Sequence, residues 1–222
     1  GYFETELQLR YPNNELYVRN MCDGGNTPGF RPHSGRPTPW AFPGAEKFQT
    51  ELADNPHTEG FLAYPDEWIA THSADIIIAM FGFDESFQGP AGVENYKAEL
   101  EAFIKHTKSK KYNGSSAPQL AIVSPIAFED LSNKFDLPNG QAENKNLHLY
   151  KEAMKQVAEK NGVLFVDAFT PTKTWLDNPT NDLTIDGSQL SDDGYKKFAP
   201  FLVDAVFGKS PVINESNRAN VL

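Results

Sequence analysis

The sequence has one cysteine, no long apolar run and few basic residues. A single cysteine, Cys22, excludes an internal disulfide framework and a cysteine-rich zinc site. The longest apolar run covers residues 76–81, far short of the roughly 18 residues that span a bilayer, so it predicts a buried strand. Lys and Arg number 20 against 30 Asp and Glu, and the resulting charge of −10 argues against nucleic acid or an anionic membrane as a main partner.

The remaining composition is that of a folded domain. The chain has 222 residues, of which 39% are hydrophobic and 12% aromatic, enough for one sizeable core. We expect a domain over residues 1–208, followed over 209–222 by a linker or the start of a further segment. Nothing in this chain calls for a cofactor, and no signal peptide is visible.

Short apolar segments alternate with helical ones along the chain. The pattern predicts strands at residues 16–20, 75–81, 119–124 and 163–167, and helices at 4–10, 44–55, 65–72, 91–107, 144–161 and 191–207. Parallel strands need crossover helices, so this order predicts a three-layer α/β/α fold with a mainly parallel sheet. Ligands of such folds bind beyond the carboxyl ends of the strands.

Three loops at the predicted strand ends contain polar groups or glycines. Gly24 and Gly25 could present backbone N–H groups to an oxyanion, or they could form a plain turn. Asp84 and Glu85 follow the most apolar strand, where they could form a polar site or begin a helix. Asp186 could be a catalytic acid or could fix its own turn. Each alternative is open at the level of sequence.

Together, the order and positions of these segments resemble the SGNH (GDSL-type) hydrolases over residues 16–207. The resemblance implies a flavodoxin-like fold in which the Gly25 N–H serves the oxyanion hole. Asp84 stands where the family has an asparagine of the same hole. Asp186 stands at the position of the catalytic acid and Gln189 at that of the catalytic histidine.

The departures from the family pattern concern its reactive groups. The Gly-Asp-Ser block with the nucleophile normally lies on a first strand ahead of Tyr2, so this first strand is expected to be missing from the chain. A carboxamide at Gln189 cannot act as a general base near neutral pH. A carboxylate at Asp84 would repel an oxyanion. The resemblance therefore implies a degenerate active site.

Three runs look like one group within the family, namely residues 81–87, 124–129 and 183–187. They are similar to SGNH-like domains at the front of large secreted planctomycete-type proteins, which often continue into haem-binding domains. This implies a periplasmic or extracellular, non-catalytic module for binding or assembly. Its partners would be a carbohydrate or acylated small molecule and other domains or chains. The alternative is a carbohydrate acetylesterase whose nucleophilic serine lies on a segment outside this chain.

Other residues could supply a different site. Arg31, His33 and Arg36 form a cationic group that could bind an acidic ligand or could face water, and Glu85 is a further ligand-binding candidate. Serines that could replace the nucleophile are Ser34, Ser86, Ser124 and Ser188. The other histidines stand singly and predict no metal site; they are His57, His72, His106 and His148.

Overall fold

The computed structural model describes residues 1–33, 35–49, 60–178 and 182–209, which form two compact units. The sheet unit comprises Cys22–Pro125 and Glu143–Phe169. The helical unit comprises Gly1–Met21, Ile126–Ala142 and the chain from Thr170. Of the expected segment over 209–222, only residue 209 is among the described residues.

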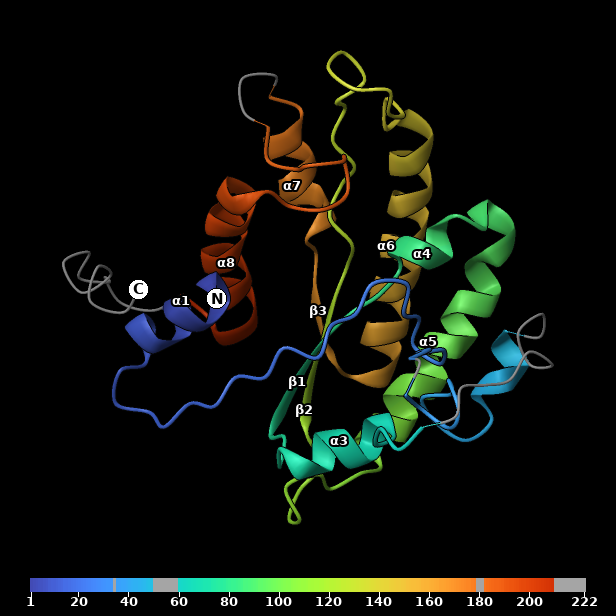
Figure 1. Ribbon diagram of the computed structural model, residues 1–222, viewed down its shortest axis with the longest axis vertical. Coiled ribbons are helices and arrows are strands. Elements are labelled where there is room, and N and C mark those ends of the chain that lie inside the picture. Colours follow the sequence, from blue (N-terminus) through green and yellow to red (C-terminus); the bar gives the residue numbers. More distant parts are fainter. Residues whose placement is uncertain (34, 50–59, 179–181, 210–222) are drawn as a thin grey trace. The chain divides into compact units, whose positions relative to one another are not determined.

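The sheet unit is built on three parallel strands, β1 (Ile76–Met80), β2 (Gln119–Val123) and β3 (Leu164–Val166), with β2 in the centre (Figure 1). In the register, Ile76 lies opposite Gln119 and Met80 opposite Val123. The crossover between β1 and β2 runs through one helix, and that between β2 and β3 through another. The predicted α/β fold with a parallel sheet is confirmed.

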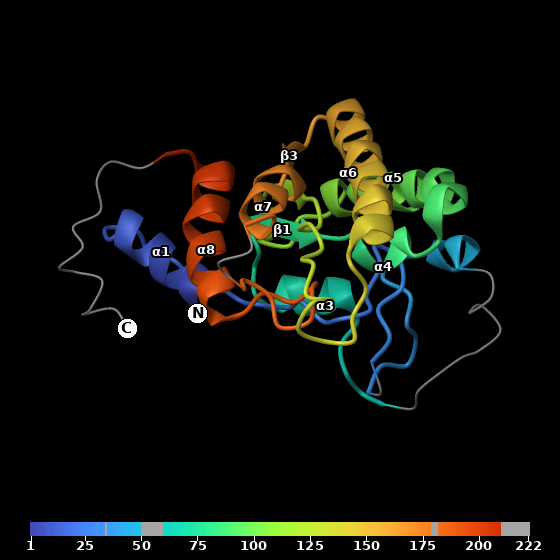
Figure 2. The same cartoon turned by 90° about the horizontal axis from the view of Figure 1, so that it is seen from above.

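These two crossover helices, α5 (Val93–Lys108) and α6 (Gln141–Asn161), lie side by side (Figures 1 and 2) and supply much of the core. Leu100 of α5 and Met154 of α6 are fully buried, as is Ile122 of β2. The apolar positions recur at helical spacing, which is why each helix buries one face. Shorter elements of this unit are η1 (Ala45–Phe48), α3 (Pro65–Thr71), α4 (Phe83–Ser86) and η2 (Gly89–Gly92).

In the helical unit, α1 (Tyr2–Arg10) lies beside α8 (Asp192–Phe207) (Figures 1 and 2). The Tyr2 hydroxyl donates to Asp192 Oδ1 at 2.6 Å. Ser191 is the N-cap of α8, because its hydroxyl accepts the Gly194 N–H at 3.2 Å. The remaining helix, α7 (Phe169–Leu176), begins in the sheet unit and ends in the helical unit.

Two predicted elements differ from the structure. Residues 16–20 form no strand, and within the described chain no neighbouring strand pairs with them. A strand forms only when a second segment pairs with its backbone, and Tyr17 is instead 72% exposed. Of the helix expected at 44–55, only the short turn Ala45–Phe48 is found; residues 50–55 lie outside the described residues.

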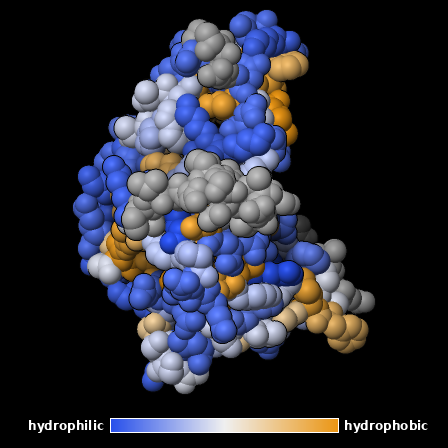
Figure 3. Space-filling view, turned by 90° about the vertical axis from the view of Figure 1, so that its left-hand side faces the viewer, coloured by the Kyte–Doolittle hydropathy of each residue, from blue (hydrophilic) through white to orange (hydrophobic). Residues whose placement is uncertain are grey.

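The face of the molecule in Figure 3 is mainly hydrophilic with separate apolar areas. The described residues contain no helix that is both long and apolar enough to cross a membrane. This finding agrees with the absence of a long apolar run in the sequence.

β1 is an edge strand with the sequence of a central one. Among the described residues it pairs only with β2, and Ile76 and Met80 are 43% and 41% exposed. Its sequence Ile-Ile-Ile-Ala-Met contains no charge or proline, the usual devices that protect an edge from pairing with another chain. This edge is therefore where we expect another strand to pair.

We expect the chain to self-associate through this edge and Met80→Lys to weaken the association, because a charged edge side chain opposes strand pairing. Sedimentation velocity over a range of concentrations measures the effect. Tyr195→Lys, at a 47% exposed position of α8, is the control and should leave association unchanged. A chain that stays monomeric at all concentrations would contradict the prediction.

Candidate functional site

β1 ends in a left-handed glycine that leads directly into α4. Gly82 has φ +100°, and a Cβ atom there would lie 3.1 Å from the Tyr96 hydroxyl, so glycine is required. The turn places Asp84 and Glu85 at the carboxyl end of the sheet, in the first turn of α4. These two acids thus begin a helix and also lie where ligands of parallel α/β folds bind.

The structure brings together the two residues that the resemblance assigns to an oxyanion hole. Burial raises the pKa of Asp84, and the backbone N–H of Gly25 close to its carboxylate partly offsets the rise. An oxyanion hole needs donors aimed at the developing charge. Here an acid of the chain itself lies beside the Gly25 donor, and its negative charge would repel an oxyanion.

We expect the chemical shift of the Gly25 amide proton to follow the ionisation of Asp84. The pKa of Asp84 is raised above the ordinary 3.8, so the midpoint should lie above that value, with the Gly25 N–H most polarised by the carboxylate at higher pH. NMR titration of the wild type and of Asp84→Asn, in which the step should vanish, measures this. The Gly114 amide, which donates to a backbone carbonyl at 2.9 Å, should not move. A flat Gly25 titration in the wild type would refute the contact.

Glu85 lies under the turn rather than facing a ligand. Its side chain is 4% exposed, and its Oε2 accepts the Gly82 N–H at 2.8 Å. Burial raises the pKa of Glu85 to about 8, and the nearby Glu99 adds to the rise. Glu99 is itself held by the Thr27 hydroxyl at 2.7 Å. Glu85 therefore supports the Gly82 turn from the core and does not face a ligand.

The candidate serines have structural contacts. Ser124 follows β2 and is 3% exposed; its Oγ accepts the N–H groups of Ala168 and Phe169 at 2.9 and 3.0 Å. It anchors the start of α7. Ser86 is 4% exposed, and its hydroxyl donates to a backbone carbonyl at 2.6 Å. Ser34 lies outside the described residues.

The loop with Asp186 and Gln189 belongs to the helical unit. Asp186 Oδ1 accepts the N–H groups of Gln189 at 2.7 Å and Ser188 at 2.9 Å, and the Ser188 hydroxyl at 3.0 Å. Burial alone would raise the pKa of Asp186, but these hydrogen bonds outweigh it and hold the pKa below its ordinary value. Asp186 therefore fixes its own turn. It and Gln189 are both exposed.

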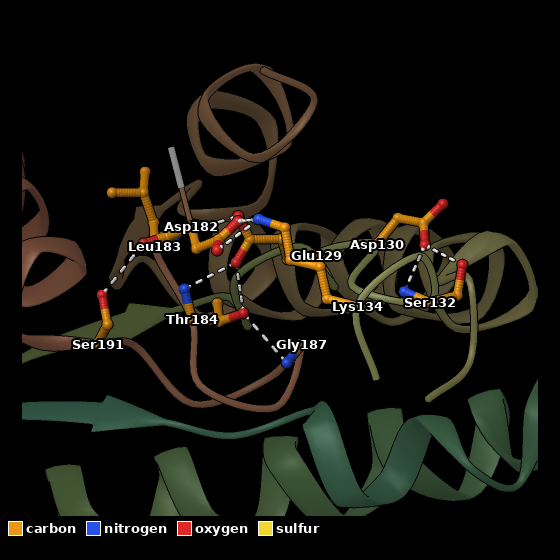
Figure 4. A network of polar contacts seen from close by, with 9 residues as sticks. All are labelled: Glu129, Asp130, Ser132, Lys134, Asp182, Leu183, Thr184, Gly187 and Ser191. Carbon is orange, nitrogen blue, oxygen red and sulfur yellow. Dashed lines mark hydrogen bonds and ion pairs between the residues drawn. The ribbon is translucent and has the colours of Figure 1, made fainter. Parts of the chain in front are cut away.

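A buried acid that the sequence did not single out holds this loop (Figure 4). Glu129 is 3% exposed; its carboxylate accepts the N–H groups of Leu183 at 3.1 Å and Thr184 at 2.7 Å. The Thr184 hydroxyl donates to the same carboxylate and accepts the Gly187 N–H. The Glu129 N–H donates to the Gly187 carbonyl at 2.8 Å. In the sequence, the one sign of this role was the presence of an acid in a mainly apolar loop that follows a buried strand.

The cationic group of the sequence is largely buried. The Arg31 guanidinium lies 5.4 Å from the Phe81 ring and 5.3 Å from the Phe103 ring, and burial lowers its pKa to about 10. Arg36 is 8% exposed and donates to the Arg31 carbonyl at 2.9 Å. Only His33 is exposed, and its Nδ1 accepts a backbone N–H at 3.1 Å. The two arginines hold the loop against aromatic side chains.

A second polar cluster, also missed from sequence, centres on Asp66. It accepts the Tyr112 hydroxyl at 2.6 Å, contacts His106 Nε2 at 2.7 Å and pairs with Lys110 at 3.2 Å. Burial would raise the pKa of Asp66, but these contacts lower it overall. The described part of the chain holds no group of three His, Cys, Asp or Glu side chains that could bind a metal ion. His57 lies outside that part.

No known protein family and no curated protein matches this chain in sequence. Solved structures do match. A variant of an acetyl-xylooligosaccharide esterase from Geobacillus is 18% identical with a TM-score of 0.62, and the match covers 96% of this chain and 82% of that one. A GDSL-like lipase from Parabacteroides merdae is 14% identical with a TM-score of 0.62, covering 94% of this chain and 81% of that one.

The acetylxylan esterase from Geobacillus stearothermophilus is 17% identical with a TM-score of 0.55, covering 92% of this chain and 78% of that one. These matches confirm the fold: the chain has the α/β fold of SGNH-type esterases. Catalytic variants of that esterase replace a serine, an aspartate and a histidine, the last two being three positions apart. Asp186 and Gln189 have the same separation in this chain.

Proposed function

We propose that this chain is an SGNH-type domain that binds an acylated carbohydrate or similar acyl compound without hydrolysing it, as a module of a larger secreted protein. The position of the Asp84 carboxylate beside the Gly25 backbone, near enough for that backbone to lower its pKa, carries the proposal. A negative charge beside this donor opposes the oxyanion that acyl transfer would form. Gln189 supports the same conclusion, because a carboxamide removes no proton from a nucleophile.

The ligand class is the part of the proposal that the comparisons support. Esterases with this fold act on acetylated xylooligosaccharides and acetylxylan. A site that once held such a substrate can keep its shape after losing its reactive groups, because binding and chemistry depend on different contacts. The proposal involves no cofactor, and its protein partners are the other domains or chains of the larger protein.

A second candidate function is ester hydrolysis with a nucleophilic serine supplied by a segment outside this chain. The observation that favours it is the retention of Asp186 at the spacing of the catalytic aspartate. Asp186 is exposed, and its pKa is held low enough to keep it ionised near neutral pH. Such an enzyme would need a base other than Gln189.

Hydrolysis of p-nitrophenyl acetate distinguishes the non-catalytic binding domain from the ester hydrolase. We would compare this chain with a version extended N-terminally from its own gene, each with and without Gln189→His. The proposal expects no turnover in either wild-type protein. Activity that appears only with Gln189→His would support a domain that has lost its base. Turnover by the extended wild type, abolished when its serine is changed to alanine, would overturn the proposal in favour of an enzyme.

Binding is tested separately by calorimetry with acetylated and deacetylated xylooligosaccharides. We expect the acetylated form to bind and Asp84→Asn to change its affinity, since Asp84 lies at the carboxyl end of the sheet. Asp130→Asn is the matched control, because Asp130 is exposed and accepts the Ser132 N–H and hydroxyl within its own turn. Equal heats for both sugars, or none, would count against an acyl-binding module.

A further inference from the structure

The short helix after β1, which lies beside α6 (Figures 1 and 2), ends in an exposed aromatic side chain. Phe87 is the C-cap of α4 and is 68% exposed. Its ring lies 5.4 Å from the Phe83 ring at an angle of 89°, an edge-to-face contact. Residues four apart share one face of a helix, and the inner face of α4 contains Glu85 and Ser86, each 4% exposed. The two rings therefore lie on the outer face of α4.

A single exposed aromatic side chain is ordinary, but the helical turn holds this one in place. The Phe87 N–H donates to the Asp84 carbonyl at 3.2 Å, and the Ser86 hydroxyl donates to the Phe83 carbonyl at 2.6 Å. These bonds close the turn, and the edge-to-face contact limits the rotation of the Phe87 ring. A flat apolar surface is thus presented to solvent at the carboxyl end of the sheet.

Hydrogen-bonding groups lie next to these rings. Asp84 comes three positions before Phe87, and residues three apart are neighbours on a helix surface. Its half-buried carboxylate can accept hydrogen bonds but cannot donate them. The Gly25 backbone N–H close to that carboxylate is a donor. The outer face of α4 therefore combines an apolar ring with an acceptor and a donor.

A sugar ring has the complementary chemistry. One face of a pyranose consists mainly of C–H groups with a small positive partial charge, and the face of an aromatic ring is negative. The hydroxyl groups lie around the edge of the pyranose, where they can both donate and accept. A purely apolar partner, such as a hydrophobic peptide, would bury the Asp84 carboxylate without hydrogen bonds, which is costly. The combination therefore favours a carbohydrate over an apolar partner.

We propose that Phe87 is a specificity-determining residue for a sugar: its ring stacks on the C–H face of a pyranose unit whose hydroxyl groups bind Asp84. Phe83 is a positioning residue that holds the Phe87 ring. The inference rests on the proposed function, and it identifies the contact with the sugar itself, as distinct from its acyl group.

Phe87→Leu and Phe87→Trp test the contact, because leucine is apolar but has no ring and tryptophan restores one. By calorimetry, we expect Phe87→Leu to weaken the binding of acetylated xylooligosaccharide about tenfold and Phe87→Trp to restore it. Phe135→Leu is the control, since Phe135 is a 55% exposed phenylalanine of the helical unit, and it should bind as the wild type. Urea unfolding should differ little among these variants, because both phenylalanines are exposed.

A measurement on the wild type makes the test independent of the variants. Carbon-13 NMR of protein labelled at phenylalanine rings should show the Phe87 signals shifting as the acetylated sugar is added, while the Phe135 signals stay in place. Bound sugar that leaves the Phe87 signals unchanged would overturn the stacking contact.

The remaining outcomes separate this inference from the proposed function. Unchanged affinity in Phe87→Leu, with the acetylated sugar still preferred, would overturn the stacking contact and leave the proposed function intact. If that variant instead reduced self-association in sedimentation velocity, the ring would be a contact between copies of the chain. Equal binding of acetylated and deacetylated sugars by the wild type, weakened in Phe87→Leu, would support the contact but count against an acyl-binding module. No binding of either sugar would overturn both.

Discussion

Glu129→Ala is expected to destabilise the protein by about 3 kcal/mol or more, because it leaves several buried donors without an acceptor. The Glu129 carboxylate accepts two backbone N–H groups, those of Leu183 and Thr184, and the Thr184 hydroxyl. An unsatisfied buried donor costs about 1–3 kcal/mol. No water reaches these groups easily, since Glu129 is 3% exposed and Thr184 4% exposed. Urea unfolding followed by circular dichroism measures the loss.

The neighbouring acid provides the control for this prediction (Figure 4). Asp130 accepts the Ser132 N–H and hydroxyl within its own exposed turn, so Asp130→Ala should cost far less. Hydrogen exchange localises the effect: the Leu183 and Thr184 amides should lose protection in Glu129→Ala and keep it in Asp130→Ala. Equal losses of stability in the two variants would mean that Glu129 does not anchor the loop.

The parts of the fold that were predicted correctly depend on local patterns. Helix α6 is found at Gln141–Asn161 against a predicted 144–161, because its apolar residues recur at helical spacing. The strand predicted at 75–81 is found at Ile76–Met80. A continuous apolar run is typical of a strand in a parallel sheet, although β1 lies at the edge of the sheet with Ile76 and Met80 partly exposed. Elements of this kind can be predicted from neighbouring residues alone, without knowing which distant residues they contact.

The parts that failed depend on contacts between distant segments. Residues 16–20 have a strand-like sequence but no neighbouring strand among the described residues. Helix α7 was not predicted, because its sequence Phe-Thr-Pro-Thr-Lys-Thr-Trp-Leu is rich in β-branched threonine. It begins where Ser124 accepts the N–H groups of Ala168 and Phe169, a contact spanning 44 and 45 residues. No local pattern contains that information.

The same limit applies to the candidate site. The resemblance gave the positions of Gly25, Asp84 and Asp186, because motif order is a property of the sequence. It did not give the proximity of the Asp84 carboxylate to the Gly25 backbone. Nor did it give Glu129, whose partner Thr184 is 55 residues away. Buried acids are costly to leave unpaired, so their partners become visible only when the fold is known.

The second large loss of stability is expected from a substitution at Gly187, which forms the turn of the same loop. Its φ of +91° is one that L side chains rarely adopt, and a Cβ atom would lie 2.3 Å from the Phe128 ring. The same atom would lie 3.0 Å from the Glu129 carbonyl oxygen. Gly187→Ala therefore adds backbone strain of about 1–2 kcal/mol to overpacking of about 1–3 kcal/mol. We expect a total loss of about 2–5 kcal/mol by urea unfolding.

Gly114→Ala separates the two contributions. Gly114 has a left-handed φ of +79°, but a Cβ atom there would meet nothing within 4 Å. That variant should therefore lose only the backbone part, about 1–2 kcal/mol. The difference between the two variants measures how tightly Phe128 and Glu129 close on the turn that presents Asp186. If Gly187→Ala lost no more stability than Gly114→Ala, the turn would be free to move, and Asp186 would not be held in a fixed position for binding or for catalysis.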